Sequence, residues 1–170
     1  MEARIGFKYA FSEGPTKTSP DALLSSMLEN EGNKKVLINC QLYVASVLRA
    51  LGLYVPDYYR SAEFFFDPNH CLRGLEYPTI TLQQGDIFGL SKNSDSDPKK
   101  IHLGVGREGD NHTLEILHIS RETNGIEATT IENIIQNEKY GNIRFVKRPL
   151  VFNPDLYNQS ALLVLKFLKE

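Results

Sequence analysis

The chain has 170 residues, 41% of them hydrophobic and 24% charged, which suits one domain with a real hydrophobic core. Its formal net charge of −2, with no basic stripe among the aromatic residues, gives no reason to expect a nucleic-acid partner. Apolar runs such as 161–165 are too short to cross a bilayer, so we expect no membrane span.

The N-terminal residues and the cysteines both bear on location. Residues 1–6 show no basic region followed by an apolar one, so we expect no secretory signal and a cytoplasmic protein, with export by another route left open. Cys40 and Cys71 allow at most one disulfide, and a reducing compartment is the simpler interpretation. We expect no cofactor and no metal, and nothing in the sequence indicates an oligomeric state.

The first part of the chain predicts short elements. Alternating apolar and aromatic residues within 4–11 predict an edge strand or an extended lead-in. Ser19 and Pro20 are placed to begin a helix, predicted over about 21–30. Residues 1–35 are therefore expected to form a helical lead-in to the rest of the domain.

The clearest helix signal lies within residues 36–52. Asn39 is a good N-cap, apolar residues recur behind it at helical spacing, and Gly52 is placed to end the helix. Cys40 therefore falls in the first turn, where unpaired N–H groups and the helix dipole favour a thiolate. A nucleophile fits this position, and so does a core cysteine.

The remaining elements alternate between strands and short helices. A helical turn is predicted over 61–66 and another over 131–138, and a final amphipathic helix is predicted from 153 to 168. Strands are predicted over 86–90, 101–107, 113–119, 125–130 and 142–148. Helices followed by an antiparallel meander predict a single domain over 1–170 of the α+β class, with helices packed on one face of the sheet.

Two histidines fall on neighbouring predicted strands. Strand pleat places His102 on one face with Gly104 and Gly106, and such glycines mark a close backbone, for which the start of the cysteine helix is the candidate. A hairpin loop over 108–112 would put His102 directly opposite His118, with Cβ atoms roughly 4.5–5.5 Å apart.

These residues suggest acyl transfer through a thioester. Cys40 is the expected nucleophile, and His102 takes its proton or forms an ion pair with it. His118 hydrogen-bonds the other ring nitrogen of His102 and fixes its tautomer. Main-chain N–H groups at the start of the helix stabilise the oxyanion. A zinc site on the same three residues is a less favoured alternative.

Four segments resemble motifs of the NlpC/P60 cysteine peptidases, a family of the papain-like fold group. They are residues 39–42, 82–88, 102–106 and 117–120, in the family's order and rough spacing, and the resemblance covers about residues 36–150. It implies an NlpC/P60-like α+β fold in which N-terminal helices pack on a central antiparallel sheet. It also implies a catalytic cysteine at a helix N-terminus.

The sequence departs from the family pattern at several positions. Asn39 stands for the usual Asp, and Gln41-Leu42 stands for Ser-Gly, which indicates a divergent member. Tyr9 lies where the family has a lead-in Tyr and is expected to line the substrate site. Gln41 either contacts substrate or covers the helix end, and Phe65 lies in a groove wall or in the core.

The resemblance implies hydrolysis of an amide bond in a peptide or isopeptide, including γ-D-glutamyl bonds of cell-wall stem peptides. The expected partner is a peptide or muropeptide substrate. Two alternatives stay open: an acyltransferase or thioesterase on the same Cys/His pair, and a catalytically inactive peptide-binding module. Gln41 and Leu42 are the best sequence support for the inactive module.

Overall fold

The computed structural model of the chain describes residues 7–9, 36–56, 59–120 and 125–153. Its helices are α2 (Cys40–Ala50), α3 (Ser61–Phe66) and α4 (Ile131–Ile135), with 3-10 turns η1 (Pro98–Lys100) and η2 (Asp110–His112). Its strands are β1 (Phe7–Tyr9), β2 (Val36–Ile38), β3 (Leu72–Leu75), β4 (Ile87–Ser91), β5 (His102–Glu108), β6 (Leu114–Ser120), β7 (Gly125–Thr130) and β8 (Asn142–Pro149). The helices predicted over 21–30 and from 153 onward lie outside the described residues.

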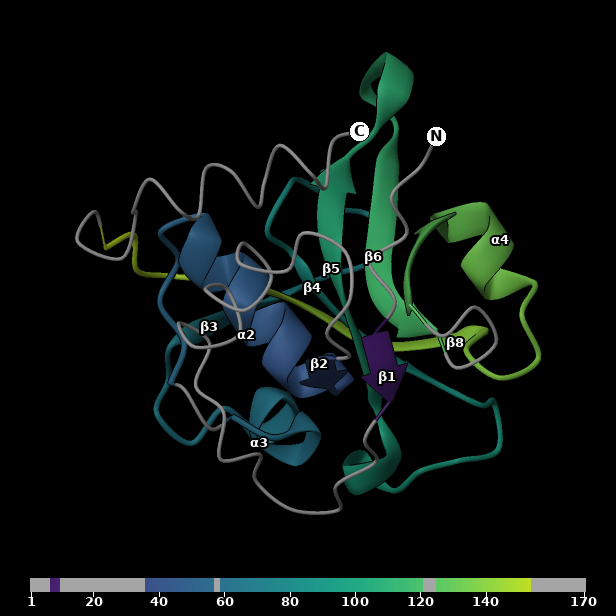
Figure 1. Ribbon diagram of the computed structural model, residues 1–170, viewed down its shortest axis with the longest axis horizontal. Helices are drawn as coiled ribbons and strands as arrows, with labels where there is room; N and C mark the ends of the chain where they lie inside the picture. Colours follow the sequence, from purple (N-terminus) through teal and green to yellow (C-terminus); the bar gives the residue numbers. More distant parts are fainter. Residues whose placement is uncertain (1–6, 10–35, 57–58, 121–124, 154–170) are drawn as a thin grey trace.

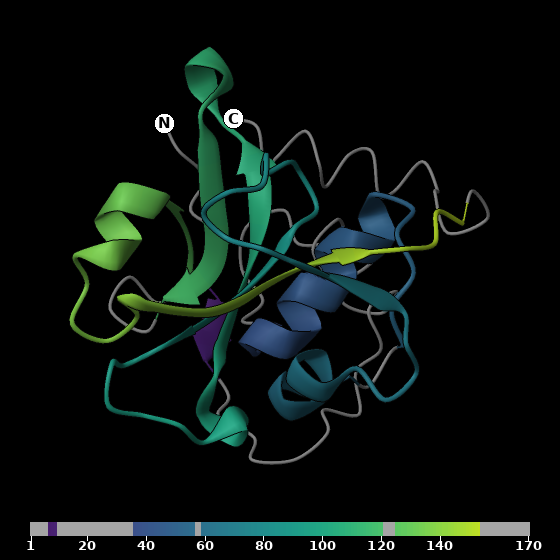
Figure 2. The ribbon, with the colours of Figure 1, turned by 180° about the vertical axis from the view of Figure 1, so that it is seen from behind.

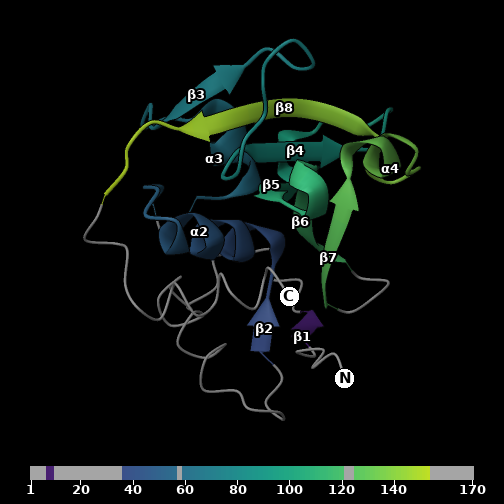
Figure 3. The same cartoon turned by 90° about the horizontal axis from the view of Figure 1, so that it is seen from above.

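Six strands form one antiparallel sheet, which confirms the α+β class (Figure 1). The strand order is β3-β8-β4-β5-β6-β7. Strands β4 to β7 follow one another as the predicted meander. The last strand was expected to extend this meander, but β8 instead returns to pair between β3 and β4, as the view from above shows (Figure 3). Strands β2 and β3 were not predicted.

The sheet carries an apolar cluster on each face, because successive side chains of a strand point to opposite sides. On one face, residues of the sheet pack with α2: Ile87, Leu103, Val105, Leu117 and Ile119. On the other face, a second set packs with Ile134 of α4: Phe88, Leu90, Ile116 and Val146. Helices α2 and α4 therefore cover opposite faces (Figures 1 and 2), and the prediction that the helices cover one face is wrong.

Helix α2 begins and ends as its sequence predicts. The side chain of Asn39 accepts the N–H of Leu42 at 2.8 Å, and Gly52 takes a φ of +74° just beyond the helix. The core-facing residues Val44 and Leu48 are fully buried. Each contributes about 1.5–3 kcal/mol by leaving water, which seats the helix firmly on the sheet.

The β5–β6 hairpin pairs two positions away from the predicted register. Gly104 lies opposite His118, and the turn consists of residues 109–113. The reason is Thr113, whose N–H and hydroxyl both bond the carbonyl oxygen of Asp110, so that it stays in the turn. A shift of two keeps both histidines on one face, where they become diagonal neighbours.

The glycines of β5 do not mark contact with the cysteine helix. A Cβ on Gly106 would lie 3.0 Å from the carbonyl oxygen of Gln83, and the Gly106 N–H donates to the carbonyl oxygen of Asp86 at 2.7 Å. A Cβ on Gly104 would clash with Ile116. The turn before β4, and not α2, is therefore the backbone that requires glycine here, which corrects the prediction.

Candidate functional site

Cys40 is the first residue of α2, as predicted, and its thiol is half-buried. It packs against the apolar cluster on the α2 side of the sheet. The hydrogen-bond donors that act on its sulfur are the main-chain N–H groups of Leu103, Gln41 and Cys40 itself and the hydroxyl of Ser61. Cys40 therefore lies against the backbone of β5, one residue beyond His102.

The thiol of Cys40 is protonated in the resting protein. Burial raises its pKa above the ordinary value, and the surrounding N–H and hydroxyl donors offset only part of that effect. The N–H groups at the helix N-terminus do favour the thiolate, as predicted, but the cost of burying a charge is larger than the stabilisation by these donors.

His102 and His118 are hydrogen-bonded to each other, as predicted. Nε2 of His102 lies 3.2 Å from Nδ1 of His118, and the rings meet edge to face with centroids 5.2 Å apart. On its far side, Nε2 of His118 lies 3.3 Å from Oγ1 of Thr129 in β7. The three side chains form one hydrogen-bonded row across β5, β6 and β7.

Both imidazoles are neutral at neutral pH. Burial, followed by the neighbouring His118, lowers the pKa of His102 to about 3. Burial also lowers the pKa of His118, against an opposing effect of the Glu127 carboxylate and of the Ile119 main chain. The pair is thus a potential proton acceptor, held without charge in a protected place.

Tyr140 covers the histidine pair. Its ring stacks on His102 with centroids 4.6 Å apart and planes inclined by 24°. It also meets His118 edge to face at 5.7 Å. Tyr140 packs against the apolar cluster on the α4 side of the sheet. Tyr140 therefore covers one face of the His102 ring and also contacts the ring of His118.

The structure brings together two of the three predicted catalytic side chains. Cys40 lies with the cluster on the α2 side, and the two imidazoles lie with Tyr140 on the α4 side. Within the described ranges no hydrogen bond joins the Cys40 sulfur to either ring. The thiol of Cys40 and the imidazole of His102 thus both lie at the start of β5, and no hydrogen bond joins them within the described ranges.

The predicted substrate-lining residues occupy three different settings. Tyr9 ends β1, which runs parallel to β2 and pairs with it so that Tyr9 lies opposite Ile38, two residues before Cys40. Gln41 donates from Nε2 to Oγ of Ser61 at 3.3 Å, so its side chain links α2 to α3. Phe65 packs against Phe145, with ring centroids 6.0 Å apart.

Sequence reasoning missed three residues that touch this site: Ser61, Thr129 and Tyr140. Thr129 lies on the same face of β7 as its partner Ile116, and hence on the face of His118. The sequence predicted the strand over 125–130 that carries Thr129, but the place of Thr129 beside His118 depends on the β6–β7 register. Ser61 and Tyr140 come from distant segments and gave no local signal.

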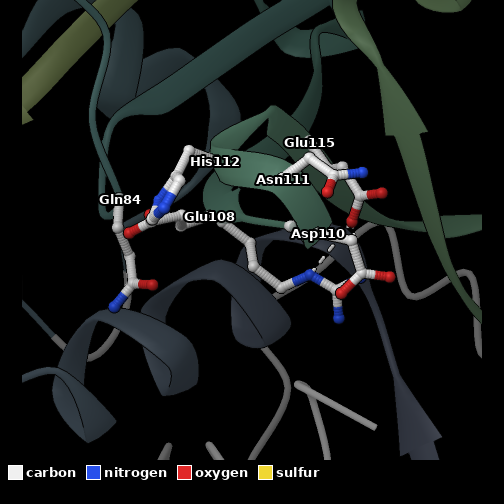
Figure 4. Close-up of a pocket in the computed structure, with 8 residues that line it drawn as sticks. Gln84, Glu108, Asp110, Asn111, His112 and Glu115 are labelled. Atoms are coloured by element: carbon white, nitrogen blue, oxygen red, sulfur yellow. Dashed lines mark hydrogen bonds and ion pairs between the residues drawn. The ribbon is translucent and has the colours of Figure 1, made fainter.

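A polar pocket of about 540 Å³ opens at the β5–β6 hairpin, at the end of β5 away from His102 (Figure 4). Its lining residues are Gln84, Arg107, Glu108, Gly109, Asp110, Asn111, His112 and Glu115. Arg107 and Glu115 form an ion pair at 2.5 Å, and Glu108 contacts His112. Arg107 lies five positions along β5 from His102, about 17 Å away, so this pocket does not serve the histidine pair.

Metal and membrane features are not found in the described part of the chain. Residues 7–9, 36–56, 59–120 and 125–153 contain no group of three or more His, Cys, Asp or Glu side chains placed to hold a metal ion. No helix in the same ranges is long and apolar enough to cross a membrane.

Comparison with known proteins identifies no family for this chain. No protein-family model, curated protein or solved structure matches it. The likeness to the NlpC/P60 peptidases therefore rests on the four sequence motifs alone.

Proposed function

We propose that this chain is a cysteine hydrolase of NlpC/P60-like fold that cleaves amide bonds of a peptide or isopeptide through Cys40, His102 and His118. The observation that supports it best is that the Cys40 sulfur and the His102–His118 pair both lie at the start of β5. The sulfur of Cys40 lies at a helix N-terminus among N–H donors, against the main chain of Leu103. The adjacent residue, His102, carries a neutral imidazole held by His118.

The reaction follows from these groups. The sulfur attacks the carbonyl carbon of the amide while its proton passes to Nδ1 of His102. Main-chain N–H groups of Cys40 and Gln41 stabilise the oxyanion. The C–N bond breaks as His102 returns the proton to the leaving nitrogen, which leaves a thioester. Water then attacks the thioester, His102 takes its proton and gives it to the sulfur, and the carboxylic acid is released.

Burial sets the main energetic demand of this mechanism. It raises the pKa of Cys40 and lowers that of His102, so both groups rest without charge. A cysteine–imidazole ion pair forms only when the ring of His102 turns toward the sulfur. The donors at Leu103, Gln41 and Ser61 then help to stabilise the thiolate.

The test is the rate of alkylation of Cys40 by iodoacetamide as a function of pH, in the wild type and in His102→Ala. Peptide mass mapping separates Cys40 from Cys71. We expect alkylation of the wild type at pH 7 to be slowed in His102→Ala, because the buried, protonated thiol then loses the base that accepts its proton. His112→Ala is the matched control, because this histidine is exposed and lies in the hairpin turn. A positive result justifies a substrate screen that begins with cell-wall peptides.

A second candidate is a peptide-binding module without catalysis. Two observations favour it: the raised pKa of Cys40, and a thiol that makes no hydrogen bond to either imidazole within the described residues. An ordinary thiol titration that His102→Ala leaves unchanged would select this candidate and overturn the hydrolase.

A further inference from the structure

Arg144 lies at an irregularity of β8, level with the start of β5. The pairing of β8 with β4 shifts between Phe145 and Ile143, so Arg144 is the extra residue of a bulge. The β4 residue that pairs with Phe145 pairs on its other side with Leu103, whose N–H donates to the sulfur of Cys40. Strands β8, β4 and β5 are neighbours in the sheet (Figure 3). Two spacings of about 4.8 Å therefore put the bulge about 10 Å from the main chain beside Cys40.

Aromatic rings connect Arg144 with Cys40. The hydroxyl of Ser61 acts on the Cys40 sulfur, and Phe65 is one turn further along the same side of α3. The guanidinium carbon of Arg144 lies 5.6 Å from the centroid of the Phe65 ring, which also packs against Phe145. Cys40, Phe65 and Phe145 are all partly buried and pack against the apolar cluster on the α2 side of the sheet. The thiol, the two rings and the guanidinium therefore lie around the same part of that cluster.

The guanidinium of Arg144 is held in place by neutral groups. Its Nη1 and Nη2 donate to the main-chain carbonyl oxygens of Asp95 and Ser96, at 2.6 and 3.4 Å. These bonds use two of its five N–H donors, and no carboxylate among the described residues pairs with it. The carboxylate of Asp95 instead lies 3.5 Å from Nζ of Lys100. The charge of Arg144 is therefore available to an anion, and the planar fork of a guanidinium fits a carboxylate.

We propose that Arg144 is a specificity residue, whose guanidinium binds a carboxylate of the ligand that is brought to Cys40. The ligand class is an acyl compound that carries a carboxylate and has an apolar part that packs on Phe65. This inference deepens the proposed hydrolase and rests on it for the reaction of the ligand. The preference of this surface for anions is a property of the folded protein, whatever its activity.

The preference can be measured at the thiol itself. Iodoacetate and iodoacetamide alkylate the same thiolate and differ by one negative charge. A positive charge about 10 Å away raises the local concentration of the anionic reagent and not that of the neutral one. The ratio of the two rate constants at Cys40, with Cys71 separated by peptide mass mapping, therefore reports the charge of Arg144 independently of thiol ionisation.

We expect Arg144→Gln to lower the iodoacetate-to-iodoacetamide ratio about fourfold at low ionic strength. The loss should shrink at about 1 M salt, where the screening length falls to about 3 Å. Arg144→Lys keeps the charge and should keep a ratio close to that of the wild type. Arg73→Gln is the matched control, because Arg73 is exposed on the edge strand β3, which lies on the other side of β8 from β4.

Three results would overturn the proposal. They are an unchanged ratio in Arg144→Gln, an equal loss in Arg73→Gln, and a change of both rate constants by the same factor, which would mean that Arg144 only holds the loop at Asp95. In the substrate screen, exchange of a substrate carboxylate for a carboxamide should raise KM in the wild type and not in Arg144→Gln. Equal effects in both proteins would show that the carboxylate binds elsewhere and would also overturn the proposal.

The two proposals fail differently. If the reaction of the wild type with iodoacetamide does not depend on His102, the hydrolase is wrong while the charge preference measured at Cys40 stands. If His102 controls alkylation but the ratio of the two reagents ignores Arg144, only the role of Arg144 is wrong.

Discussion

Cys40 and Cys71 are both free thiols, the first half-buried and the second buried, and the hydrogen bonds at their sulfur atoms differ. The sulfur of Cys40 is surrounded by donors, including the N–H of Leu103 and the hydroxyl of Ser61. The sulfur of Cys71 instead donates to a carboxylate, Oδ1 of Asp67, at 3.2 Å.

The two sites therefore differ in how well they accommodate a negative charge on sulfur. Burial raises the pKa of both cysteines, but the remaining effects diverge. Donors lower the pKa at Cys40. At Cys71 the hydroxyl of Tyr59 lowers the pKa, but the hydrogen bond to Asp67 and the charge of Asp67 raise it. A negative sulfur at Cys71 would face a carboxylate, and at Cys40 it would face N–H groups. In the proposed hydrolase, Cys40 rather than Cys71 is therefore the nucleophile.

Asp67 is the hydrogen-bond acceptor that links Tyr59, Cys71 and Leu72, and we call this cluster the structural site. It ends α3 with a φ of +47°, and its carboxylate accepts hydrogen bonds from the hydroxyl of Tyr59 at 2.9 Å and from the N–H groups of Cys71 and Leu72 at 3.0 and 2.9 Å. Burial alone would raise the pKa of Asp67, but these donors lower it below its ordinary value. The carboxylate therefore ties α3 to the start of β3 in its charged form.

The largest expected effect is at this carboxylate. We expect Asp67→Ala to lower the free energy of unfolding by about 3 kcal/mol, because it leaves buried donors unsatisfied and puts alanine at a positive φ. Urea denaturation measures it, and Asp110→Ala, at an exposed turn position, is the control. The folded variant should keep the wild-type alkylation of Cys40. A loss below about 1 kcal/mol would mean that the site is not structural.

The histidine pair should make stability depend on pH. In the folded protein the pKa of His102 is about 3, below its ordinary value of 6.5. Between these two values the unfolded chain therefore binds a proton at His102 that the folded chain does not. Stability is therefore lost as pH falls from 6.5 toward 3, by up to about 1.4 kcal/mol per pH unit.

Urea denaturation at pH 7, 5.5 and 4.5 checks this dependence. His102→Gln keeps a polar side chain without the titration, and its free energy of unfolding should fall less steeply over the same range. The lowered pKa of Asp67 acts at more acidic pH, below its ordinary value of 3.8, so the two effects occupy different windows. Equal slopes in variant and wild type would show that His102 is solvated.

Local chemistry made much of this fold predictable. The cap at Asn39, the end of α2 at Gly52 and strands β4 to β8 are set within a few residues, and each was predicted at nearly its final position. Long-range features were not predictable in this way. The insertion of β8 beside β4 and the placement of α4 on the second face depend on contacts between distant segments.

The site shows the same division. Cys40 and the two histidines were proposed as catalytic from their neighbours in sequence, and the His102–His118 hydrogen bond was expected and is present. The register depended on whether Thr113 stays in the turn, which the alternation of apolar residues does not decide. Thr129 and Tyr140 acquire a role only after register and topology are known. The contrast between Cys40 and Cys71 depends on burial and on Asp67, a residue that the sequence places only in a turn.

A smaller effect is expected when the Cys71 thiol is removed. Cys71→Ala loses the hydrogen bond to Asp67 and part of a buried side chain, and should cost about 1–2 kcal/mol of unfolding free energy. Cys71→Ser keeps a donor to Asp67 and should lose less. Differential scanning calorimetry ranks the two variants. If alanine is tolerated better than serine, packing rather than the hydrogen bond determines the role of Cys71.

The smallest expected effect is at Ser61, beside Cys40. Ser61 is 2% exposed, lies in the first turn of α3, and its hydroxyl acts on the sulfur of Cys40 while it accepts from Gln41. Removing this donor in Ser61→Ala should raise the pKa of Cys40 and slow its alkylation at pH 8 about threefold, since one neutral donor contributes well under 1.4 kcal/mol. Gln41→Leu, which leaves the hydroxyl of Ser61 in place, should change the rate less. Thiolate absorbance against pH, measured in Cys71→Ser so that Cys40 is the titrating thiol, gives the shift directly. An unchanged titration in Ser61→Ala would mean that the main-chain N–H groups alone oppose burial at Cys40, and the nucleophile would then depend on the backbone of α2 and β5 without help from α3.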